Sequence, residues 1–79
     1  MAAADDLEIL EDTIDGVRTI TIRNNSKDKT IEAQVLVSAI DQKAVYKVTL
    51  KPLGVDQVAH ERPDATRCLY EIDTAVYLP

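Results

Sequence analysis

The longest apolar stretch of the chain covers residues 30–41 and repeats with a period of two. One face carries five small or branched apolar residues, Ile31, Ala33, Val35, Val37 and Ala39. Leu36 and Ile40 add apolar side chains to the opposite face. A period of two is typical of a β-strand, and apolar residues on both faces indicate a central one. We therefore predict that residues 30–41 form the central strand of a sheet.

The segment before this strand predicts a β-hairpin. Two alternating stretches, residues 7–14 and residues 17–23, flank Asp15-Gly16, a dipeptide that two-residue type I′ turns prefer. A tight turn there sets Ile9 opposite Ile22 on one face and Glu8 opposite Arg23 on the other. The alternative is that the two strands splay into different sheets of a sandwich, and the sequence leaves both arrangements open.

Three further alternating stretches follow the central strand. Residues 44–51 carry Tyr46, Val48 and Leu50 on one face, and Pro52-Leu53-Gly54 predicts the turn that ends them. Residues 55–60 predict a short strand with Val58 pointing inward.

The last stretch leaves two alternatives open. Residues 66–72 place Cys68, Tyr70 and Ile72 on one face, and residues 75–78 are apolar again. Asp73 between them marks either a bulge in one long strand or a turn between two strands.

Six or seven strands without a convincing helix predict an all-β fold. We expect a small antiparallel β-sandwich of the immunoglobulin-like kind, with a small open β-barrel as the alternative. A chain of 79 residues has room for one core, so residues 7–79 are expected to form a single domain. Residues 1–6 are small and acidic and are expected to form a flexible N-terminal arm.

The order of turns and strands resembles small bacterial immunoglobulin-like domains. The resemblance rests on a strand that ends at Asn24-Asn25-Ser26, the longer apolar strand after it, and Leu50-Lys51-Pro52-Leu53-Gly54 before a short valine strand. It spans residues 17–78 and implies a shape, without a specific family or site, because the Cys, Trp and Cys of true immunoglobulin domains are missing.

The formal net charge of −5 argues against nucleic acid and anionic membrane surfaces as partners. Membrane insertion is not expected, because no stretch reaches the roughly 20 apolar residues of a spanning helix. The first residues lack the pattern of a secretory signal, and the single cysteine favours a reducing compartment such as the cytoplasm. These features leave the localisation open.

Two residues are candidates for nucleophilic chemistry, but both have simpler interpretations. Cys68 alternates with apolar neighbours and is expected to fill core space, while His60 is expected to be a solvated residue at a strand end. We predict no enzyme activity, because the chain lacks a convergent set of catalytic groups.

Four carboxylates are expected at one end of the domain if every strand reverses direction: Asp12, Asp15, Asp41 and Asp64. Converging carboxylates can hold Ca²⁺, which takes six to eight oxygen ligands. A solvated acidic rim is the preferred interpretation, and no cofactor or metal is predicted.

The predicted function is that of a non-enzymatic protein-interaction or structural module that binds through an edge strand or end loops. A protein partner is expected, and self-association into a homo-oligomer is a further expectation. Three residues form the candidate interaction surface, Leu36, Ile40 and Tyr77. The alternative is a small acidic protein of the phage inhibitor or decoration type, which binds a macromolecular partner.

Overall fold

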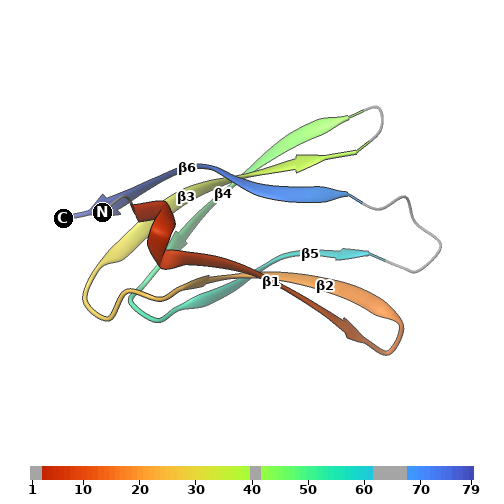
Figure 1. Cartoon of the computed structure of the whole chain (residues 1–79), viewed down its shortest axis with the longest axis horizontal. Helices are drawn as coiled ribbons and strands as arrows, with labels where there is room; N and C mark the ends of the chain where they lie inside the picture. Colours follow the sequence, from red (N-terminus) through yellow and green to blue (C-terminus); the bar gives the residue numbers. More distant parts are fainter. Residues whose placement is uncertain (1–2, 40–41, 62–67) are drawn as a thin grey trace.

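The chain forms two three-stranded antiparallel sheets that face each other in a sandwich-like arrangement (Figure 1). The computed structural model describes residues 3–39, 42–61 and 68–79. Sheet A has the order β1-β2-β5 and sheet B the order β4-β3-β6. The elements are the 3₁₀ helix η1 (Ala3–Asp6) and the strands β1 (Leu7–Ile14), β2 (Val17–Asn24), β3 (Thr30–Ser38), β4 (Lys43–Leu50), β5 (Val55–Glu61) and β6 (Leu69–Leu78).

The all-β prediction is confirmed: no α-helix occurs in the part of the chain that the structure describes. Pairing is confined to each sheet, since no strand ladder among the described residues joins sheet A to sheet B. This arrangement agrees with a sandwich better than with the alternative of an open barrel.

The hairpin of β1 and β2 has the predicted register. Ile9 pairs with Ile22 and Glu8 with Arg23, without interruption along the two strands. Asp15 and Gly16 have φ angles of 52° and 78°, and two successive positive φ angles are the geometry of a type I′ turn. The register predicted for a tight turn is therefore confirmed, and the alternative in which the two strands belong to different sheets is wrong.

Strand β3 is the central strand of sheet B, as its two-faced apolar pattern predicts. It ends at Ser38, before the predicted end at residue 41; Ala39 is outside the strand, and residues 40 and 41 lie outside the described residues. Ile31, Ala33 and Val35 are buried, while Val37, two positions further along the same face, is half-buried. Burial thus decreases along β3 toward its C-terminal end.

Strand β6 resolves the alternative left open at Asp73. The chain from Leu69 to Leu78 is one strand, so residues 3–39, 42–61 and 68–79 contain six strands. Its register with β3 shifts so that Val35 pairs with Ile72 and Gln34 with Thr74, which leaves Asp73 as the extra residue of a bulge.

The residues before β1 form an ordered turn where the sequence predicts an arm. Ala3–Asp6 form η1, which contacts both β1 and β6 and buries Ala3. The tyrosine hydroxyl of Tyr77 donates to Asp6 Oδ2, and the backbone N–H of Asn25 donates to Asp6 O. The ordering arises from contacts with distant strands, which local composition does not reveal.

Asn24 ties the strand ends together at the end of the sandwich that holds both termini (Figure 1). Its fully buried side chain donates through Nδ2 to the carbonyl oxygens of Lys29, Leu50 and Lys51 at 2.8, 3.1 and 3.1 Å. Its Oδ1 accepts the Ser26 N–H at 2.9 Å. One side chain at the end of β2 in sheet A therefore bonds backbone groups at the end of β4 in sheet B and in the loops beside it, and we call this region the closed end.

The turn after β4 completes the closed end. Leu53 has a φ of 58°, and the Gly54 N–H donates to Lys51 O at 2.8 Å, as in a type II turn with Pro52 at its second position. A Cβ at Gly54 would lie 2.8 Å from Lys51 O, so this position requires glycine.

At the other end, which we call the open end, the two sheets diverge (Figure 1). Arg18 spans the space between them. Its guanidinium donates to both carboxylate oxygens of Glu11 at 2.7 and 3.0 Å, and to Cys68 O at 3.1 Å. It also lies 5.4 Å from the centroid of the Tyr70 ring. Polar contacts thus replace apolar packing between the sheets here.

Candidate functional site

Four strands form sheet edges, and each edge leaves backbone groups without a strand partner in its sheet. These strands are β1 and β5 in sheet A and β4 and β6 in sheet B. The pairing of β5 shifts opposite Ile20 and Thr21, and the pairing of β6 is shifted by the Asp73 bulge. Bulges twist an edge and discourage further pairing, so β1 and β4 are the two regular edges.

The β4 edge exposes apolar side chains on both of its faces. Val45, on the outer face, is 53% exposed, and Tyr46, on the inner face, is 47% exposed. The sequence correctly places Tyr46 on the inner face, because it pairs with Val35. Tyr46 is nevertheless exposed, whereas Leu50, four residues further along the same face, is buried.

Two lysines flank Val45 on the outer face of β4. Lys43 and Lys47 are both exposed, and they pair in register with Ser38 and Gln34 of β3. Lys47 Nζ lies 3.3 Å from Glu32 Oε1, in an ion pair whose side chains are 62% and 34% exposed. Such an exposed pair stabilises the fold by less than about 1 kcal/mol, so Lys47 remains available to another carboxylate.

The structure places two residues of the predicted interaction surface, Leu36 and Tyr77, on opposite faces of sheet B. Leu36 is half-buried on the outer face of sheet B, where it pairs with Val45. Tyr77 is half-buried on the opposite, inner face, because it pairs with Ile31. Ile40 lies outside the described residues. Only Leu36 therefore adjoins the β4 edge.

The alternation of residues 44–51 predicts that the face carrying Val45 is wet, and Val45 is indeed exposed. Sequence reasoning missed the exposure of Tyr46, because alternation indicates which face a residue occupies and not how closely the other sheet approaches that face. One signal was available: Lys43 and Lys47 four residues apart on one face are typical of an edge strand.

Tyr77 joins the C-terminal strand to η1. Its hydroxyl donates a hydrogen bond to the Asp6 carboxylate, and Lys29 Nζ lies 5.4 Å from the centroid of its ring. The hydrogen bond to Asp6 raises the pKa of Tyr77, and partial burial and the nearby carboxylates act in the same direction. These contacts give Tyr77 a structural role.

The two candidates for nucleophilic chemistry lie on different elements. Cys68, just before β6, is half-buried, and its backbone carbonyl accepts from Arg18. His60 is exposed on β5, where it pairs with Thr19.

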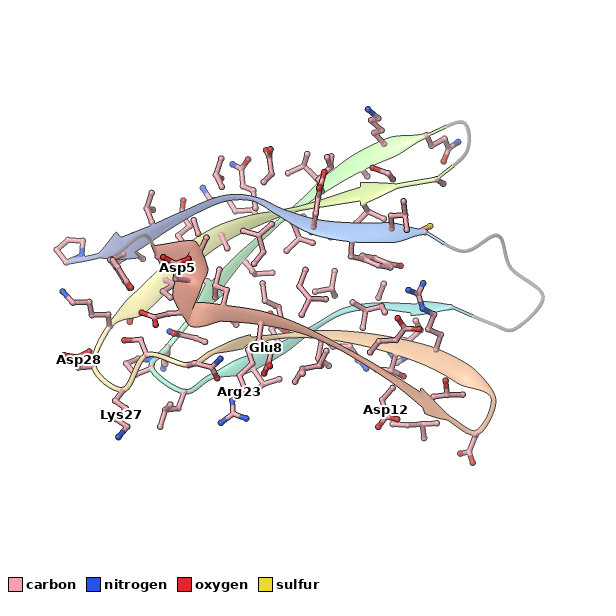
Figure 2. All side chains as sticks on the ribbon, viewed as in Figure 1. Asp5, Glu8, Asp12, Arg23, Lys27 and Asp28 are labelled. Carbon is pink, nitrogen blue, oxygen red and sulfur yellow. The ribbon has the colours of Figure 1, made fainter. Side chains whose placement is uncertain are left out.

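The candidate calcium carboxylates are only partly described. Asp12 and Asp15 are exposed in the β1–β2 hairpin, and Figure 2 shows Asp12 on the outer side of that hairpin, whereas Asp41 and Asp64 lie outside the described residues. Within residues 3–39, 42–61 and 68–79, no three His, Cys, Asp or Glu side chains group so as to hold a metal ion.

Comparisons with protein-family models, with curated proteins and with solved structures give no match to this chain. No helix in the described part of the chain has the length and apolar character to cross a membrane.

Proposed function

We propose that the chain is a non-enzymatic protein-interaction module that binds an extended segment of a protein partner along the β4 edge. The observation that supports this most directly is the exposure of Val45 and Tyr46 on the two faces of one regular edge strand. A strand added beside β4 would take up its outward N–H and C=O groups and cover both side chains.

The other edges are less suited to strand addition. The β5 and β6 edges are interrupted by bulges, and η1 contacts β6. The β1 edge is regular but carries Glu8, Glu11 and Asp12, which disfavour close approach of another strand. Glu11 is, in addition, engaged by Arg18.

We further propose that the sandwich is immunoglobulin-like. In that fold the second strand pairs with the fifth in one sheet, and the third strand pairs with the sixth in the other sheet. Here β2 pairs with β5 in sheet A, and β3 pairs with β6 in sheet B. A fourth strand beside the third occurs in the variable type, which corresponds to the place of β4.

Blocking the β4 edge with proline tests the proposed function. Successive residues of an edge strand direct their N–H groups alternately to the neighbouring strand and to solvent. Of Val45→Pro and Tyr46→Pro, one therefore removes a β3–β4 hydrogen bond and unfolds readily, while the other removes only an outward N–H. The more stable variant is the edge-blocked protein.

Affinity capture from the source organism then compares the wild-type and edge-blocked proteins. We expect the principal captured partner to be lost from the edge-blocked protein. The more stable of Asp12→Pro and Thr13→Pro provides the matched control on β1 and should retain it. Retention of every partner by the edge-blocked protein would rule out binding along β4.

A further inference from the structure

The four edges differ in charge as well as in regularity. Carboxylates occur on three of them: β1 carries Glu8, Glu11 and Asp12, β5 carries Asp56, and β6 carries Glu71 and Asp73. Strand β4 carries Lys43 and Lys47 and no acidic residue. Both regular edges expose apolar side chains, Leu10 and Ile14 on β1 and Val45 and Tyr46 on β4. In a chain of net charge −5, β4 is thus the regular edge on which exposed apolar residues are combined with basic rather than acidic ones.

We propose that the β4 edge selects an acidic extended peptide, with two carboxylates four residues apart that face Lys43 and Lys47. This inference rests on the proposed function, since it names the partner chemistry of the same edge. Opposite charges on directly facing residues of paired strands stabilise the pairing, whereas like charges destabilise it.

The pairing geometry defines the rest of the peptide. In an antiparallel pair, residues that face each other lie on the same side of the sheet. The residue midway between the two carboxylates therefore faces Val45 on the outer side. The two peptide residues between these three positions face Ala44 and Tyr46 on the inner side. We expect branched apolar side chains at these two positions of the peptide.

A second copy of this chain fits the edge less well. Two β4 strands related by a twofold axis pair antiparallel with their inner faces on the same side. If Val45 or Lys47 lies on the axis, lysines face each other directly; if Tyr46 lies on it, the lysines of the two strands become diagonal neighbours. Lysine repulsion thus disfavours self-pairing and favours an acidic strand.

The ion pair of Lys47 with Glu32 does not prevent this recognition. Glu32 lies on β3, the neighbour of β4 within sheet B, whereas an added strand would lie on the other side of β4, along its free edge. The Lys47 ammonium has three donors and can bind both carboxylates. Recognition that depends on exposed charges should weaken as salt increases.

Three synthetic peptides test the proposal by NMR titration of the isotope-labelled protein. The probe is Ser-Glu-Val-Thr-Val-Glu-Ser, in which the carboxylates have the required spacing. The first control replaces both glutamates by glutamine. The second, Ser-Val-Glu-Thr-Glu-Val-Ser, has the same composition, but its carboxylates face the inner side. We expect the probe to shift the β4 amide signals and to bind about fivefold more tightly than either control.

Protein variants complete the test as a double-mutant cycle. In Lys43→Gln/Lys47→Gln, the preference for the probe over its glutamine control should disappear. The matched variant Arg23→Gln/Lys27→Gln changes the net charge equally, and Figure 2 shows Arg23 pointing outward from β2 and Lys27 in the β2–β3 loop. This variant should retain the preference.

Three outcomes would overturn the inference. Equal binding of all three peptides along β4 would remove the acidic preference while leaving strand addition intact. Failure of every peptide to shift the β4 amides would remove peptide recognition, and the capture experiment would still decide the proposed function on its own. A dimer in sedimentation analysis that dissociates in the edge-blocked protein would identify a second copy as the occupant.

Discussion

The two ends of the sandwich derive from the same alternating pattern but are held together by different forces. At the closed end, apolar residues of both sheets meet, and Asn24 joins the strand ends through buried hydrogen bonds. At the open end, Arg18 and Glu11 lie between sheets that diverge, and Tyr46 of β4 is 47% exposed. The comparison shows that alternation determines which face a residue occupies, whereas the separation of the sheets determines whether that face is buried.

The largest effect is expected from Asn24→Ala. The substitution leaves buried carbonyl groups and the Ser26 N–H without their partner, which should reduce the free energy of unfolding by about 3 kcal/mol. Urea denaturation measures the loss. Asn25→Ala, at the exposed neighbouring position, should change stability by less than about 0.5 kcal/mol. Equal losses in the two variants would contradict the role assigned to the Asn24 side chain.

A second comparison uses two valines on the same face of β3. Val35 is fully buried, and Val37 is half-buried toward the open end. We expect Val35→Ala to reduce the free energy of unfolding by about 2 kcal/mol and Val37→Ala by about 1 kcal/mol, because the first leaves a cavity and the second a partly hydrated surface. The same denaturation curves would refute the contrast between the ends if both losses were alike.

Arg18→Lys tests the polar contacts of the open end at constant charge. Lysine cannot reproduce the two parallel hydrogen bonds to Glu11, so we expect a loss of about 1 kcal/mol. Arg23→Lys on the same strand is the control, because Arg23 is exposed and should tolerate the change. Thermal unfolding of both variants at low and high salt would show whether the contact is electrostatic, since screening should narrow the difference between wild type and Arg18→Lys.

The smallest effect concerns Tyr77, whose raised pKa links stability to pH. The hydrogen bond to Asp6 favours the neutral phenol, so its contribution is fully present below the ordinary pKa of about 10 and is lost as pH rises through the higher pKa of the folded state. We expect Tyr77→Phe to lower the melting temperature by a few degrees at neutral pH. The difference from wild type should shrink at strongly alkaline pH; a difference that stays constant there would exclude the hydrogen bond as its source.

Local rules predicted the parts of this fold that depend on neighbouring residues. The turn dipeptide Asp15-Gly16 predicted the register of the first hairpin. At Asp73 the sequence predicted an interruption but left a bulge and a turn open, and the pairing of β6 with β3 identifies the bulge. The two faces of residues 30–41 identified a central strand, because burial on both sides leaves a pattern within one segment.

The parts that depend on distant residues could not be predicted in this way. Asn24 belongs to a run of turn-forming residues, and its side-chain partners Leu50 and Lys51 lie far along the chain. The ordering of η1 needs Tyr77, which is 71 residues from Asp6. Identifying β4 as an edge strand requires the order of the strands in sheet B, and the alternation of residues does not encode that order.

The strand order also governs the time course of folding. The β1–β2 and β3–β4 hairpins can form from adjacent segments, but β2 must wait for β5, and β3 must wait for β6, which is synthesised after the other five described strands. Because closing long loops precedes these pairings, folding should be slow for a domain of this size. Before β6 is synthesised, one side of β3 has no strand partner, although its other side can already pair with β4. During that time chaperones or incorrect strand pairings can compete for this apolar strand.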